Sequence, residues 1–120
     1  MARSFMRVVG IILVLVGLVG FVEPFNGIFN LTPMHDVVHL LTGAVALAVS
    51  GSENASRIYA WIFGVVYLIV AATGLLTANL LGMIPLKPAD DVLHLLLGVA
   101  GLVVAYMATQ KASRTHSSAA

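Results

Sequence analysis

Four apolar stretches, separated by short polar breaks, take up most of this chain of 120 residues. A helix that crosses a bilayer needs about 20 mostly apolar residues. The stretches that reach or approach this length are Phe5–Val22, Met34–Ser50, Ile58–Leu81 and Asp91–Gln110. The first two are short, so they require a thin bilayer or a snorkelling Arg7 side chain. The pattern predicts an all-α fold, an integral membrane four-helix bundle.

The composition excludes the soluble alternatives. Hydrophobic residues make up 60% of the chain and charged residues only 9%, whereas an ordinary soluble domain is about 25% charged. So few charges cannot cover the surface of a small soluble monomer, and a disordered chain would be polar. The net charge of +1 gives no reason to expect a nucleic-acid partner, and the lack of cysteine excludes disulfides, thiolate metal sites and cysteine nucleophiles. The composition therefore points to the lipid bilayer as the surroundings of the chain.

The positions of the basic residues predict the orientation. Five of the six lie on one side of the predicted spans, namely Arg3, Arg7, Arg57, Lys111 and Arg114, and Lys87 lies on the other. Basic residues stay on the cytoplasmic side of a membrane. We therefore expect a multi-pass protein of the inner cell membrane with both termini in the cytoplasm.

The chain contains an internal repeat. Leu31–Ser50 aligns with Leu86–Ala105 at an offset of 55 without gaps, and ten of the twenty positions are identical. The preceding spans match more weakly at an offset of 54. We expect a membrane domain over residues 1–110, built from tandem two-helix repeats at 3–52 and 57–107, and a disordered cytoplasmic tail at 111–120. Because each repeat holds two spans, the copies should be related by a pseudo-two-fold axis along the membrane normal.

Small residues predict where the helices touch. Lipid supplies no hydrophobic drive between helices, so close backbone contacts at small residues hold membrane bundles together. The expected packing positions are Gly10, Gly17, Gly43, Gly64 and Gly98.

The pattern Asp-x-x-His-x-x-x-Gly occurs once in each repeat, as Asp36, His39 and Gly43 and as Asp91, His94 and Gly98. Residues at i, i+3 and i+7 share one face of a helix. Each histidine lies about six residues inside its helix, or about 9 Å at 1.5 Å per residue, just below the outer headgroups. Ionisable residues at that depth normally face the bundle interior. The pseudo-symmetry would then bring His39 and His94 towards each other.

Three interpretations of this pattern stay open. In the first, each aspartate stabilises the start of its helix and accepts a hydrogen bond from its own histidine, which bonds across to the other hairpin. In the second, Asp36, His39, Asp91 and His94 hold metal ions as carboxylate–histidine bundles do, or His39 and His94 hold a haem or another pigment. In the third, the four residues form a proton or ion relay.

Two further residues near the same face, Glu23 and His35, could add donors to a ligand site. The identity of any cofactor stays unknown at this point. The sequence contains no glycine-rich phosphate loop, nucleophile elbow or zinc-hydrolase signature, so we expect no enzymatic activity.

Three segments resemble a known family: Leu31–Gly43, Arg57–Tyr67 and Asp91–Gly98. Together they resemble the small prokaryotic membrane proteins filed as domain of unknown function 4383, over nearly the whole chain up to Gln110. The resemblance implies a four-span membrane fold and no agreed activity, substrate or cofactor. Members of that family more often carry Asn at the positions of Asp36 and Asp91, which favours helix capping over a strict carboxylate-ligand role.

With short loops and no complete catalytic set, the leading functional hypothesis is a protein that acts by packing. It would be an accessory subunit bound to a membrane-protein partner, or a homo-oligomer. The alternative is a haem-, metal- or pigment-binding protein that uses His39 and His94, and the third is a small proton or ion relay.

Overall fold

The computed structural model describes residues 1–22, 33–77, 79–80, 84–85 and 88–119. Within these ranges the helices are α1 (Ala2–Val22), α2 (Pro33–Val49), α3 (Glu53–Thr77) and α4 (Pro88–Ala119). Two strands of two residues, β1 (Asn79–Leu80) and β2 (Ile84–Pro85), pair antiparallel between α3 and α4. The prediction of an all-α helical bundle is confirmed.

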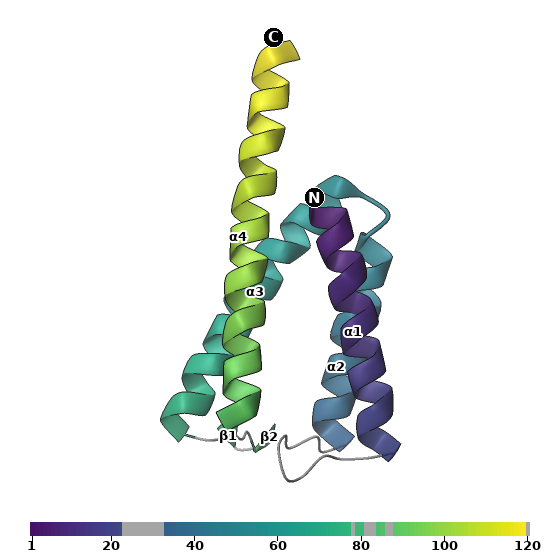
Figure 1. The fold of residues 1–120 in the computed structure, drawn as a ribbon, viewed down its shortest axis with the longest axis vertical. Coiled ribbons are helices and arrows are strands. Elements are labelled where there is room, and N and C mark those ends of the chain that lie inside the picture. Colours follow the sequence, from purple (N-terminus) through teal and green to yellow (C-terminus); the bar gives the residue numbers. More distant parts are fainter. Residues whose placement is uncertain (23–32, 78, 81–83, 86–87, 120) are drawn as a thin grey trace.

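The helices pair in chain order. α1 packs along α2 and α3 packs along α4, and α1 and α3 make smaller contacts with the opposite pair (Figure 1). The N-terminus and the C-terminal end of α4 lie toward the same end of the molecule, and β1 and β2 lie at the opposite end. The starts of α2 and α4 therefore lie at the end that carries the strands. Pro33 and Pro88 are the first residues of these two helices, where a missing N–H costs nothing.

Three of the helices are long and apolar enough to cross a membrane. The candidate spans are Ala2–Val22, Glu53–Leu76 and Ala89–Arg114, and α2 is a shorter apolar helix of 17 residues. At 1.5 Å per residue α2 is about 25 Å long, slightly less than the ~30 Å hydrocarbon core. Large aliphatic side chains cover the outside of the bundle, for example Val8, Leu15, Ile62 and Leu96, each about half exposed or more. A surface of this kind suits lipid contact and would be an aggregation surface in water.

Helix α4 continues further than the sequence predicted. Disorder was expected after Gln110, whereas the structure continues the helix to Ala119, so α4 extends beyond the start of α1 (Figure 1). Extending an existing helix adds one hydrogen bond per residue without a new nucleation cost, and Ala, Lys and Arg in this segment are good helix formers.

Glycines allow the paired helices to approach at backbone distance. A Cβ atom added at Gly10 would lie 3.0 Å from the carbonyl oxygen of Gly43, and one at Gly43 would lie 2.9 Å from the carbonyl oxygen of Gly10. At Gly17 an added Cβ would lie 2.9 Å from the Asp36 carbonyl oxygen. In the second pair, an added Cβ at Gly98 would lie 2.9 Å from the backbone nitrogen of Leu68. Side chains larger than hydrogen therefore do not fit at these positions.

The two helix pairs use equivalent contacts. Gly10 faces Leu47 of α2, and Gly64 faces Leu102 of α4. In the reverse direction Gly43 faces Val14, and Gly98 faces Leu68. Each member of the first pair matches its counterpart at the offset of 54 or 55 seen in the sequence.

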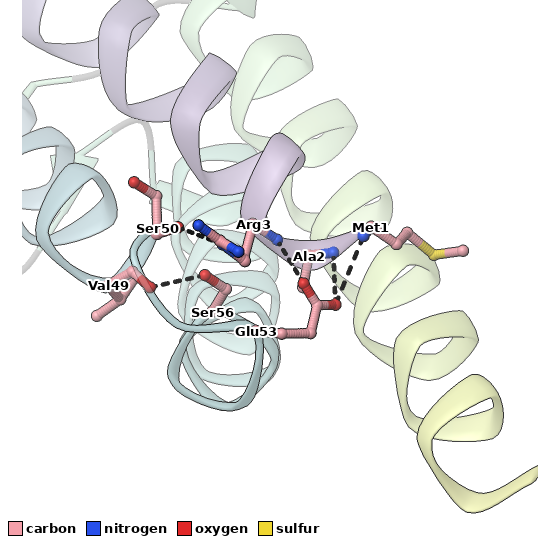
Figure 2. Close-up of polar contacts among 7 residues, drawn as sticks. All are labelled: Met1, Ala2, Arg3, Val49, Ser50, Glu53 and Ser56. Carbon is pink, nitrogen blue, oxygen red and sulfur yellow. Dashed lines mark hydrogen bonds and ion pairs between the residues drawn. The ribbon is translucent and has the colours of Figure 1, made fainter. Parts of the chain in front are cut away.

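The turn between α2 and α3 and the first turn of α3 are bound to the start of α1 by hydrogen bonds and an ion pair (Figure 2). The Glu53 carboxylate accepts hydrogen bonds from the backbone N–H groups of Ala2 at 3.0 Å and Arg3 at 3.1 Å, and lies 3.6 Å from the N-terminal ammonium of Met1. Arg3 Nε donates to the carbonyl oxygen of Ser50 at 2.9 Å. These contacts satisfy N–H groups that the first turn of a helix leaves without an intrahelical partner.

Candidate functional site

Three histidines gather near the starts of α2 and α4. His35 and His39 come from α2 and His94 comes from α4, and each is at least 94% buried. The ring centroids are 4.1 Å apart for His35 and His39, 5.6 Å for His35 and His94, and 6.2 Å for His39 and His94. One nitrogen from each ring can be chosen so that all three lie within 4.8 Å of one another. We refer to these residues as the histidine cluster.

Local helix geometry explains why these three rings meet. His35 and His39 are four residues apart, so they project from the same face of α2. His94 matches His39 at the repeat offset of 55, whereas the position that matches His35 is occupied by Asp90, which is also buried. The cluster therefore contains one matched pair, His39 and His94, and a third histidine, His35, that has no histidine counterpart in the second hairpin.

The structure places the predicted ligand residues in two groups. His39 and His94 come together in the cluster, and His35, which the sequence analysis named only as an additional donor, completes it. Among the described side chains, no group of at least three ligand atoms within the same distance includes Asp36 or Asp91. Glu23 lies outside the described residues. The signal for His35 was its spacing of four residues from His39 on a predicted helix.

Asp36 is directed at helix α1. Its carboxylate lies against Gly20, where an added Cβ atom would be 2.7 Å from the Asp36 Cγ and in collision with Oδ1. Neither carboxylate oxygen of Asp36 has a hydrogen-bond partner among the described residues. The hydrogen bond from His39 to Asp36 that the first interpretation requires is therefore not formed there.

The cluster contains buried nitrogen atoms that have no hydrogen-bond partner among the described residues. Within the described part of the chain, Nδ1 of His39 and Nδ1 of His94 are buried and have no hydrogen-bond partner. Buried polar atoms in folded proteins are almost always hydrogen-bonded, and leaving one unsatisfied costs about 1–3 kcal/mol. A bound ligand that uses these nitrogens would remove that cost.

A small cavity of about 170 Å³ opens beside the cluster between α2 and α3. All three histidines line it, together with Thr42 and Tyr67. The Tyr67 ring meets the His94 ring edge-on at a centroid distance of 5.5 Å. We call this space the α2–α3 cavity; because a water molecule takes about 30 Å³, it has room for a few waters or a very small ligand.

A larger groove of about 460 Å³ lies on the other side, between α1 and α4. Its lining is aliphatic except for His39, His94 and Asp90. We call it the α1–α4 groove. His39 and His94 line both spaces.

The donor set is that of a transition-metal site. Neutral imidazole nitrogens are good ligands for Zn²⁺, Cu²⁺ and Ni²⁺, and three histidines leave the fourth position of a tetrahedral zinc open. A haem is a poorer fit. The three ring centroids form a compact triangle, so a porphyrin placed between His39 and His94 would collide with His35.

A protein-family model matches most of the chain. The family model described as Domain of unknown function (DUF4383) matches residues 3–107. No curated protein and no solved structure matches the chain.

Proposed function

Because this chain belongs to the DUF4383 family, whose description names no activity, we propose its function from its own geometry. The protein is a multi-pass membrane protein that binds one divalent transition-metal ion through His35, His39 and His94. The observation that carries this proposal is the burial of three imidazoles whose ligand atoms lie within 4.8 Å of one another.

The distances are compatible with closure around an ion. Zinc–nitrogen bonds are about 2.0–2.1 Å long, so two ligands of a tetrahedral site lie about 3.4 Å apart. Because the nitrogens of the cluster all lie within 4.8 Å of one another, they must approach by at most somewhat more than an ångström, which rotations about the two side-chain torsions of histidine can supply. Metal binding at this position would be energetically favourable, because ionisable side chains within a membrane are costly and need a partner.

A proton or ion relay has less support than a metal site. Beyond the cluster, toward the chain termini, the core consists of Val9, Leu13 and Phe63 with the Tyr67 ring, and then of a second cluster. That second cluster is Met6, Ala46, Ala60 and Ala105, all fully buried. Among the buried residues of these two clusters, Tyr67 carries the one side-chain group that could pass a proton along, so a continuous relay has little support.

The remaining parts of the proposal concern topology and partners. We propose that all four helices span the inner membrane and that both termini are cytoplasmic, supported by the common end of the termini (Figure 1) and the basic residues there. We propose that the chain catalyses no reaction of its own. It would act as a metal-bearing accessory subunit or homo-oligomer, and the broad aliphatic outer surface supports association within the membrane.

Metal analysis of the purified protein tests the central proposal. The protein is extracted in mild detergent, stripped with a chelator, reloaded with Zn²⁺, desalted and measured by elemental mass spectrometry. We expect about one equivalent per chain, and loss of it in His39→Ala and His94→Ala. The control is His116→Ala, a histidine of the C-terminal segment. Wild-type protein that retains neither Zn²⁺ nor Cu²⁺, Ni²⁺ or Co²⁺ refutes the proposal.

A further inference from the structure

The α2–α3 cavity and the α1–α4 groove occupy corresponding places in the two repeats. At the offsets of 54 and 55, the groove residues Leu13, Val16 and Leu97 correspond to Tyr67, Val70 and Thr42, all of which line the cavity. The two spaces are thus lined by matching positions of the two halves of the chain. Their contents differ, because the cavity has Tyr67 and Thr42 where the groove has leucines.

This difference makes the groove a site for an apolar molecule. Ligand pockets in proteins are typically about 300–1,000 Å³, mostly apolar, with a few polar groups that orient the ligand. The groove, at about 460 Å³, falls in that range, whereas the cavity, at about 170 Å³, does not. Leu15 and Val19 line the groove and are 55% and 44% exposed on the outside of the bundle. The groove is therefore open on the surface that faces lipid, and its occupant enters from the bilayer.

The polar groups of the groove lie at one end. Asp90 is in the first turn of α4, and His94 follows one turn later, at the end of the molecule that carries the strands (Figure 1). From Val19 near this end, the aliphatic lining follows α1 back to Ile12, about 10 Å toward the middle of the bundle at 1.5 Å per residue. A lipid of the adjacent leaflet has this same orientation, with its head at the rim and its chain directed inward.

The charge at the polar end restricts the headgroup. Asp90 is 97% buried and lines the groove beside His39 and His94. A phosphate or carboxylate head would be placed against this carboxyl group, where like charges repel. A neutral head with hydroxyl groups can instead donate hydrogen bonds to the Asp90 carboxyl oxygens.

We infer that the α1–α4 groove binds a neutral lipid with a single chain and a hydroxyl-bearing head, of the monoacylglycerol type. The inference goes beyond the metal site and does not require it, because Asp90 and the aliphatic lining belong to the groove alone. His35 belongs to the cluster and the cavity and does not line the groove. The two proposals can therefore fail separately.

Native mass spectrometry of delipidated protein in detergent measures the binding. The probes are 1-monooleoylglycerol and oleate, which have the same chain and differ in the head. We expect the protein to retain one molecule of monooleoylglycerol and to bind oleate with an affinity at least about tenfold lower. Val16→Phe fills the groove and should lower the affinity for monooleoylglycerol by about tenfold or more. The matched control, Val70→Phe at the corresponding position of the cavity, should leave it unchanged.

Two further variants separate the headgroup from the metal. Asp90→Asn removes the repulsion and should bring oleate to within a few-fold of monooleoylglycerol. His35→Ala should lose Zn²⁺ and keep the lipid, while Val16→Phe should lose the lipid and keep Zn²⁺. The inference is overturned if wild-type protein binds neither probe, if both bind equally, or if Val16→Phe and Val70→Phe behave alike. It is also overturned if a second copy fills the groove, so that Val16→Phe converts a dimer to a monomer.

Discussion

Replacing Gly43 by alanine tests whether backbone contact holds the first helix pair together. The added Cβ atom would lie 2.9 Å from the Gly10 carbonyl oxygen and 2.9 Å from the Val14 backbone nitrogen. Backbone atoms cannot rotate away, so α1 and α2 must separate. Overpacking of a tight contact costs about 1–3 kcal/mol, and alanine regains about 0.5–1 kcal/mol of helix propensity. We expect a net loss of about 1–2 kcal/mol in the free energy of unfolding.

Reversible unfolding in mixed micelles of a mild detergent and dodecyl sulfate measures this loss. Gly51→Ala is the matched control, because its added Cβ would meet only the Ala48 carbonyl oxygen, at 3.9 Å. Gly98→Ala should match Gly43→Ala, because its Cβ would also lie 2.9 Å from backbone, the Leu68 nitrogen. If Gly43→Ala is as stable as Gly51→Ala, the helices are not in backbone contact and the reasoning is wrong.

Three further predictions concern the ends of the bundle and the site. Glu53→Gln should lower the free energy of unfolding, because it removes the charge that holds the start of α1 through two hydrogen bonds and an ion pair. The loss should be only about 1 kcal/mol, because the carboxylate is half exposed and its charge is screened by solvent. An unchanged unfolding midpoint would mean that these contacts add no stability. His39→Leu and His94→Leu should impair assembly about equally on size-exclusion chromatography, because each replaces one of the two matched imidazoles of the histidine cluster by an aliphatic side chain, and clearly unequal elution profiles would contradict their equivalence. Because the chain has no cysteine, Ser52→Cys and Ser113→Cys should both be labelled by an impermeant maleimide only in inside-out vesicles, and labelling from opposite faces would exclude a topology in which the α2–α3 turn and the C-terminal segment share the cytoplasmic side.

The sequence predicts the helices well because lipid imposes a simple length rule. An apolar run of about 20 residues has few alternatives to a helix in a bilayer, so the runs that begin near Phe5, Ile58 and Asp91 correspond to α1, α3 and α4. The strands β1 and β2 were missed because two-residue strands carry no periodicity, and Pro85 argues against a strand interior.

The candidate site was only partly accessible from sequence. Helical spacing gives the face on which Asp36 and His39 lie, but it does not give the neighbour that each side chain meets. The space beside Gly20 accepts the Asp36 carboxylate, and that space depends on how α1 lies against α2. The two cavities are equally inaccessible, because each is formed between helices from different hairpins.

The proposed duplication explains which residues of the site could change independently. His39 and His94 line both the cavity and the groove, so a change at either alters both spaces at once. Tyr67 lines the cavity, and its counterpart Leu13 lines the groove, so substitutions there can make one space polar and leave the other aliphatic. His35 and Asp90 occupy matching positions in the same way: His35 gives the cavity a third imidazole, and Asp90 gives the groove a carboxyl group. A bundle that began with two equal spaces can in this way become one with a metal site on one side and a lipid site on the other.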